Sequence, residues 1–311
     1  MFFLVEQPVR RMKAIQWKQA VAFAAVVGIC AAATHATFRA EGVIWRLPGE
    51  QRARLELQRF GMSPCTRSND DCEFGDPCGS RTLELLGDSY VHQYVAAFDQ
   101  LKTLGIRGRT STVGGCPMLP GVAPRPPRVA ECTALREREL ARVKASPADL
   151  IVVGQAWHLY LEGTGEPSER KVSEIRDGLR ALLRLLDRPG RRFLIIGGQV
   201  RPLACSFDHM RMQPGPLWHA PPTPCPPLAA ATARADASEI DDLLASALME
   251  RSNAELLRSS HVYCDENCPV VRGDGAWLFL DLGHFTVAGS QLMGQRAAAV
   301  ISRFLSGNSR P

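Results

Sequence analysis

The chain has 311 residues, of which 45% are hydrophobic and 22% charged, values that fit one large globular unit or two small ones, and we favour one. Its formal net charge of +5 is concentrated near the N-terminus, where four basic residues and one acidic residue among the first 36 contribute +3. The remaining +2 is spread over residues 37–311. This balance gives no support for nucleic-acid binding.

An export segment is predicted over residues 1–36. Basic residues at positions 10, 11, 13 and 18 precede the apolar run Ala20–Thr34, and small residues follow in AAATHA at 31–36, the order typical of a signal peptide. The run is shorter than the roughly 20 residues that span a bilayer comfortably. Two outcomes stay open: cleavage after export, or retention of residues 19–36 as an inner-membrane anchor. Both place the chain in the periplasm or another extracytoplasmic compartment.

Nine cysteines follow the export segment, and in an exported chain they favour disulfides over metal ligands. An odd count leaves one of them unpaired. The CDENC spacing at 264–268 lacks the second pair of ligands that a zinc site needs, so neither a metal nor another cofactor is predicted. Closeness in sequence favours the pairs Cys116–Cys132, Cys205–Cys225, Cys264–Cys268 and two of Cys65, Cys72 and Cys78.

Short apolar runs alternate with helical patterns over residues 81–306, after a cysteine-containing lead-in over residues 37–80. This alternation is the signature of βαβ units, so we expect a flavodoxin-like three-layer α/β/α sandwich with a central parallel sheet. The expected strands are Thr82–Leu86, Thr110–Val113, Asp149–Val153, Phe193–Ile196 and His261–Tyr263. The expected helices are Tyr90–Leu104, Arg136–Lys144, Lys171–Leu186, Ala237–Leu257 and Val287–Leu305.

A proline-rich stretch interrupts this pattern between Arg201 and Leu228, with PGPLWHAPPTPCPPL at 214–228. Proline excludes helix and central strand there, which predicts a surface loop. Two roles remain open for this loop: a wall of the substrate cleft, or a plain surface connection.

Two short segments carry residues suited to nucleophilic catalysis, GDSY at 87–90 and DLGH at 281–284. Ser89 follows the first expected strand and opens a helical stretch, which places its hydroxyl at the edge where open α/β sheets bind ligands. Asp281 and His284 lie three residues apart, so the carboxylate can orient the imidazole of a general base. None of the six other histidines has a carboxylate at this spacing. The segments therefore predict a Ser-His-Asp triad.

These motifs resemble those of the SGNH/GDSL superfamily of esterases and acyltransferases. The chain looks most like the periplasmic SGNH domains of bacterial carbohydrate O-acyltransferases. The resemblance implies that residues 81–306 are an SGNH-type catalytic domain. It rests on four blocks in the family's order: LLGDSYVHQY at 85–94, GGCPML at 114–119, ADLIVVGQAW at 148–157 and DLGHFTVAG at 281–289.

The resemblance also implies an oxyanion hole. The backbone N–H groups of Ser89 and Gly115 match the family's first two donors, and superfamily esterases supply a third from the asparagine of a Gly-x-Asn-Asp block. Here GQAW at 154–157 puts Ala156 in the asparagine position, so either Gln155 donates from the neighbouring position or the hole has two donors. The side chains expected to contact substrate are Asp88, His92 and Trp157.

The expected function is extracytoplasmic transfer of an acyl group, in the simplest case acetyl, to a cell-envelope polysaccharide through an acyl-serine intermediate. The carbohydrate acceptor follows from the resemblance alone. With at most one membrane segment, the chain cannot carry an acyl group across a membrane, so a separate multi-span acyltransferase is expected to deliver the donor. Two alternatives remain: a carbohydrate acetylesterase of the same fold, and a glycan-binding domain without catalysis that uses Trp157 and Trp218.

Overall fold

The computed structural model describes residues 17–39, 60–61, 65, 72–162, 169–202, 205, 226 and 228–306. The chain divides into two compact units, residues 1–55 and 56–311. In the first unit, α2 (Trp17–Arg39) is a helix of 23 residues that includes the predicted apolar run. None of the described helices is both long enough and apolar enough to cross a membrane.

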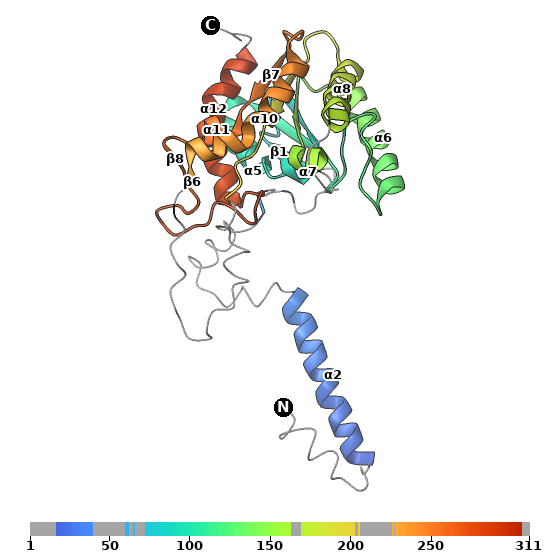
Figure 1. The fold of residues 1–311 in the computed structure, drawn as a ribbon. Coiled ribbons are helices and arrows are strands. Elements are labelled where there is room, and N and C mark those ends of the chain that lie inside the picture. The colour runs from blue at the N-terminus through green and yellow to red at the C-terminus, as the bar shows by residue number, and fades with distance from the viewer. Residues whose placement is uncertain are drawn as a thin grey trace. The chain divides into compact units, whose positions relative to one another are not determined.

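A six-stranded sheet forms the centre of the second unit. Its strands are β1 (Glu73–Gly75), β2 (Arg81–Gly87), β3 (Ile106–Thr112), β4 (Leu150–Gly154), β5 (Arg192–Ile196) and β7 (Ala254–Leu257). They lie in the order β1-β3-β2-β4-β5-β7, and all neighbours pair parallel except β1, which pairs antiparallel with β3 at one edge. Because helices cover both faces of this sheet, the expected α/β/α sandwich is confirmed, with one antiparallel strand added (Figure 1).

Side chains from the sheet build two hydrophobic clusters, one on each face. Successive residues of a strand point to opposite faces, and accordingly Leu85 of β2 belongs to one cluster and Leu86 to the other. The helices that pack on the Leu85 face include α5 (Val95–Asp99), α11 (Ser259–Tyr263) and α12 (Val287–Ser306). Those on the Leu86 face include α6 (Val129–Ala145), α7 (Trp157–Glu162), α8 (Glu169–Leu186) and most of α10 (Ala230–Leu248).

Four of the five expected strands are confirmed as β2 to β5, and the fifth is wrong. His261–Tyr263 is the end of helix α11, and the last strand of the sheet is β7. The expected helix Ala237–Leu257 therefore ends early, at Leu248. The sequence of β7, AELL, favours a helix on its own, but its backbone pairs in parallel with the buried β5, and this tertiary pairing overrides local propensity.

The expectation of one continuous helix over Tyr90–Leu104 is also wrong. The segment forms three short pieces: α4 (Ser89–His92), α5 and the 3-10 helix η3 (Gln100–Leu104). The first break is at Tyr94, whose φ of −88° and ψ of 0° are not helical. The other three expected helices are confirmed as α6, α8 and α12. A separate two-stranded sheet consists of β6 (Leu228–Ala229) and β8 (Asn267–Cys268).

The expected disulfides are present where both cysteines are described. They are Cys65–Cys72, Cys116–Cys132 and Cys264–Cys268. Cys78 is the exposed, unpaired cysteine that the odd count implies, and Cys30 is also free. Cys205 is disulfide-bonded. Its expected partner Cys225 lies outside the described residues, as does most of the proline-rich loop, so the role of that loop stays a prediction.

Candidate active site

Ser89 lies at the turn between β2 and α4. At the end of β2, Gly87 has a φ of +155°, and a Cβ atom there would overlap the carbonyl oxygen of Gly154 on the neighbouring strand. Only glycine satisfies both conditions. The chain can therefore turn sharply at the carboxyl end of the sheet. Ser89 becomes the first residue of α4, where its backbone N–H has no intrahelical partner.

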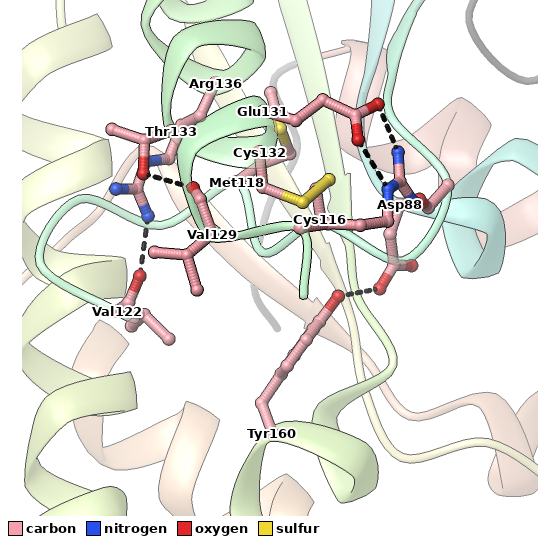
Figure 2. Close-up of a disulfide and its surroundings, with 12 residues drawn as sticks. Asp88, Cys116, Met118, Val122, Val129, Glu131, Cys132, Thr133, Arg136 and Tyr160 are labelled. Carbon is pink, nitrogen blue, oxygen red and sulfur yellow. Dashed lines mark hydrogen bonds and ion pairs between the residues drawn. A yellow bond between two sulfur atoms is a disulfide. The ribbon is translucent and has the colours of Figure 1, made fainter. Parts of the chain in front are cut away.

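Asp88 builds this turn. Its Oδ1 accepts a hydrogen bond from the Tyr90 N–H at 2.8 Å, and its Oδ2 accepts from the Ala156 N–H at 2.9 Å. The Tyr160 hydroxyl also donates to Oδ2 at 2.7 Å (Figure 2). Burial raises the pKa of the Asp88 carboxyl, although these hydrogen bonds act in the opposite direction. Asp88 thus joins α4 to the end of β4 and to α7.

The Ser89 hydroxyl, the His284 imidazole and the Asp281 carboxylate form one hydrogen-bonded chain. Ser89 Oγ lies 2.9 Å from His284 Nε2, and His284 Nδ1 lies 2.7 Å from Asp281 Oδ2. The structure therefore brings together the three residues predicted from the two motifs. With Nδ1 facing a carboxylate, the ring proton belongs on Nδ1, and Nε2 is left to accept the serine proton.

The carboxylate of Asp281 is fixed by its own loop. Its Oδ1 accepts hydrogen bonds from the backbone N–H groups of Gly283 and His284, both at 2.8 Å. Burial raises the pKa of Asp281, but the hydrogen bonds and the charge of His284, together with these two N–H groups, outweigh burial and hold the pKa below its usual value. Asp281 is therefore ionised at neutral pH, as a carboxylate that stabilises an imidazolium must be.

Two aromatic rings flank the His284 imidazole. The centroid of the Tyr90 ring lies 4.5 Å from that of His284, and the Phe60 ring approaches edge-on at 5.1 Å. A Cβ atom at Gly283 would overlap the Tyr90 hydroxyl, so the loop before His284 lies directly against this ring. These contacts were not predicted from the sequence. Tyr90 and Gly283 do sit beside Ser89 and His284 in the motifs, but no local pattern shows that they touch.

The expected oxyanion donor Gly115 lies in a turn after β3. It is exposed and has a φ of +71°, a conformation that favours glycine. The buried disulfide Cys116–Cys132 ties this turn to α6 (Figure 2). Arg128 adds a hydrogen bond to the Gly114 carbonyl at 2.9 Å. The backbone on both sides of Gly115 is therefore held in place.

Gln155 follows β4 and is 1% exposed. Its Oε1 accepts a long hydrogen bond from the Met118 N–H at 3.4 Å, which links the end of β4 to the segment after Gly115. Its Nε2 has no hydrogen-bond partner among the described residues. Buried amides without partners are uncommon. The amide N–H groups of Gln155 are thus available to donate hydrogen bonds to an oxygen of an incoming ligand.

The three side chains expected to contact substrate are all buried. The Trp157 Nε1 donates to the Ile196 carbonyl at 2.8 Å, and His92 Nδ1 lies 2.7 Å from Thr112 Oγ1. These contacts hold the ends of β5 and β3, while Asp88 holds the turn before α4. In the described structure these side chains support the site, and substrate contact by any of the three stays a prediction.

His158, one of the six histidines other than His284, lies beside the site on α7. Its Nε2 is 3.4 Å from the Tyr90 hydroxyl oxygen. Burial, followed by the positive charges of Arg201, Arg125 and His284, lowers the pKa of His158 to about 4. The imidazole is therefore neutral at pH 7 and places no positive charge beside the proton-transfer pair.

Within the described part of the chain, no group of three or more His, Cys, Asp or Glu side chains is arranged to hold a metal ion. The cysteines of the CDENC segment, which a zinc site would require as thiolates, are joined to each other in a disulfide. The groups gathered around Ser89 are those of proton transfer: a hydroxyl, an imidazole and a carboxylate.

The family model described as "SGNH domain (fused to AT3 domains)" matches residues 58–299. The chain belongs to the SGNH domain family. A similar solved structure is the periplasmic domain of a lipopolysaccharide acetyltransferase from Salmonella ser. Paratyphi A, with a TM-score of 0.52 and 18% identity over 72% of this chain and 84% of that one. A carbohydrate acetylesterase family member from Sinorhizobium meliloti has a TM-score of 0.41 and 16% identity over 73% of this chain and 99% of that one.

No curated protein sequence matches the chain significantly. The SGNH match nevertheless includes all six strands of the main sheet and every member of the hydrogen-bonded chain at Ser89. The family expected from the four sequence blocks is thereby confirmed, as is the fold expected from the alternating apolar runs and helical patterns.

Proposed function

We propose that this SGNH domain is an extracytoplasmic, serine-dependent O-acyltransferase. It transfers an acyl group, acetyl in the simplest case, to a cell-envelope polysaccharide. Ser89 is the nucleophile, His284 the general base and acid, and Asp281 the carboxylate that orients and stabilises His284. A carbohydrate supplies the acceptor hydroxyl, and no cofactor takes part.

The observation that carries this proposal is the 2.9 Å contact between Ser89 Oγ and His284 Nε2. A serine hydroxyl is a weak nucleophile until a base removes its proton. As Ser89 Oγ attacks the acyl carbonyl carbon, His284 takes the proton and Asp281 stabilises the imidazolium. His284 then gives this proton to the leaving group, and the acyl group remains on Ser89 as an ester.

The second half of the reaction reverses these steps with a new hydroxyl. A sugar hydroxyl gives its proton to His284 and attacks the ester carbonyl, and His284 returns the proton to Ser89 as the acylated glycan leaves. In both halves negative charge develops on the carbonyl oxygen and requires preorganised donors. We assign this role to the N–H groups of Ser89 and Gly115, with the Gln155 amide as the third donor.

Two comparisons support the acyltransferase assignment and its compartment. The family model describes SGNH domains fused to AT3 domains, and the Salmonella structure is the periplasmic domain of an acetyltransferase. By analogy, residues 81–306 form the catalytic domain, residues 37–80 lead into it, and residues 1–36 export the chain or anchor it in the inner membrane. A separate multi-span membrane acyltransferase delivers the acyl donor.

Labelling with a fluorophosphonate probe tests whether Ser89 is activated. We expect labelling of the wild type at Ser89, and none in Ser89→Ala, which also loses hydrolysis of p-nitrophenyl acetate. His284→Ala should label about a hundredfold more slowly, because the base is removed. Ser238→Ala, at an exposed position on α10, is the matched control and should behave as wild type. Full esterase activity in Ser89→Ala would exclude the mechanism.

Product masses distinguish transfer from hydrolysis, since both pass through the same acyl-serine. The protein is incubated with p-nitrophenyl acetate and envelope polysaccharide, in acetylated and unacetylated form. Newly acetylated glycan supports the transferase. Deacetylation alone would assign a carbohydrate acetylesterase. Retention of glycan without probe labelling would assign a binding domain.

A further inference from the structure

A cleft of about 900 Å³ lies at the edge of the sheet opposite to Ser89. Its lining includes Arg192, where β5 begins, and Asn253, directly before β7 begins. Ser89 follows the end of β2. Because these strands run parallel, their beginnings and ends lie at opposite edges, about 15 Å apart for a strand of this length. The cleft is therefore separate from the proposed acyl-transfer site.

The cleft carries strong positive charge. Six arginines and two carboxylates line it, an excess of four positive charges. One carboxylate, Asp187, already accepts hydrogen bonds from Arg251 at 2.9 Å and Asn253 at 3.0 Å. The C-termini of α8 and α10 add only partial negative charges of about one half each. The six arginines are Arg180, Arg184, Arg188, Arg191, Arg192 and Arg251.

Backbone carbonyls, not carboxylates, make the hydrogen bonds of two of these arginines. Arg191 is 2% exposed and donates to the carbonyls of Ser146, Ala148 and Leu186 at 2.6 to 3.1 Å. Arg188 donates to Ser146 and Ala148 at 3.1 and 3.0 Å. Burial, and then the charge of Arg188, lowers the pKa of Arg191. Carbonyl dipoles fix these guanidinium groups but neutralise less charge than a hydrogen-bonded carboxylate does. The carboxylates of Glu84, Asp149 and Asp187 attract Arg191 but are outweighed by burial and by Arg188, so positive charge remains for a bound anion to offset.

We propose that this cleft binds a phosphate-bearing anion. Guanidinium groups present paired N–H donors that match phosphate oxygens. Several arginines around one cleft suit a group with more than one negative charge better than they suit a single carboxylate. A cleft of this volume is within the usual range for small-ligand sites. Arg184, exposed in the last turn of α8, is the contact we assign first.

Calorimetric titration of the full chain with pyrophosphate tests the proposal. We expect saturable binding that weakens about tenfold when NaCl is raised from about 50 to about 300 mM, because salt screens exposed charges. Arg184→Gln should weaken binding about tenfold, through loss of one charge-assisted contact. Arg170→Gln is the matched control, since it removes the same charge from an exposed position at the other end of α8 and should keep wild-type affinity.

Vesicles distinguish the two sources of such a phosphate. Co-sedimentation with phosphatidylglycerol vesicles, absent with phosphatidylcholine and weakened by Arg184→Gln, assigns a lipid headgroup. Pyrophosphate binding without vesicle binding assigns a soluble anion. If neither probe binds saturably, or if Arg184→Gln and Arg170→Gln bind equally, the proposal is overturned and the arginines only brace the helix ends. None of these measurements requires turnover at Ser89, so their result is independent of the proposed function.

Discussion

The imidazole of His284 lies against the phenol ring of Tyr90, with 4.5 Å between the ring centroids and 51° between the ring planes. The hydroxyl of the same Tyr90 abuts the backbone of Gly283, where no Cβ atom can be accommodated. Since Tyr90 directly follows Ser89 in α4, one side chain connects the helix of the proposed nucleophile to the loop of the proposed base. We infer that this packing sets the separation of Ser89 and His284, on which the proposed proton transfer depends.

Gly283→Ala should therefore lower kcat for p-nitrophenyl acetate by about tenfold or more, because a Cβ atom must displace Tyr90 or the loop that carries His284. Gly273→Ala is the matched control, since a Cβ atom there meets nothing within 4 Å. Adding Tyr90→Phe to Gly283→Ala removes the closest clashing atom and should restore part of the lost rate. An unchanged kcat in Gly283→Ala would show that this contact does not position the base.

Asp281→Asn should lower kcat by about 10³- to 10⁴-fold without unfolding the protein. If the new amide oxygen keeps the N–H groups of Gly283 and His284, its NH2 group faces His284 Nδ1 and favours the wrong imidazole tautomer. Steady-state kinetics and a thermal melt check both parts. Asp274→Asn removes the same charge from an ion pair with Arg272 away from the site and should keep wild-type kcat. A loss smaller than about tenfold in Asp281→Asn would contradict the assigned role.

The hydrogen-bonded chain of Ser89, His284 and Asp281 could be predicted from sequence because each member lies in a short motif with its own local geometry. Ser89 follows an apolar run that becomes β2, and the three-residue spacing of Asp281 and His284 suffices for their hydrogen bond. Parallel strands then place their carboxyl ends at one edge, which brings the turn at Ser89 and the segment after β4 together.

The remaining features depend on packing between distant segments, which local patterns do not encode. An aromatic residue such as Trp157 fits a ligand surface and a core equally well, and only the assembled sheet shows that its indole donates to Ile196. The sequence of β7 favours a helix, and the segment forms a strand because it pairs with β5. The contact of Tyr90 with Gly283 likewise exists only after α4 and the final loop have packed together.

Gln155→Met offers a test that separates catalysis from stability. The substitution keeps the volume of the side chain but removes an amide whose Nε2 is buried without a partner among the described residues. We expect kcat to fall by about tenfold to a hundredfold, as for loss of an oxyanion donor. The free energy of unfolding should change by less than about 1 kcal/mol, because only the long bond from Met118 is lost. Wild-type kcat in this variant would assign a two-donor oxyanion hole.

The neutral His158 predicts a pH dependence of stability. Its pKa falls from 6.5 to about 4 on folding, so between these values the unfolded chain binds more protons than the folded one. The free energy of unfolding should therefore decrease as the pH is lowered from 6.5 to 4, by up to about 3 kcal/mol.

His158→Asn should remove most of this decrease, whereas the control His261→Asn, at an exposed position on α11, should retain it. Urea unfolding at several pH values in this window provides the measurement. Parallel pH profiles for the wild type and His158→Asn would show that His158 is not the source of the pH dependence in this window.

Removal of the Cys116–Cys132 disulfide should lower both stability and turnover. The bridge closes a loop with a sequence separation of 16, for which loss of the cross-link costs about 3 kcal/mol. It also holds the turn at Gly115, whose N–H we assign to the oxyanion hole, so kcat should fall with Tm in the double Cys→Ala variant.

Removing Cys264–Cys268 is the matched control: its sequence separation of 4 predicts a loss of about 2 kcal/mol of stability. That bridge lies next to β8 and away from Gly115, so kcat should remain near wild type. Equal effects of the two double variants on kcat would mean that the disulfides act on stability alone.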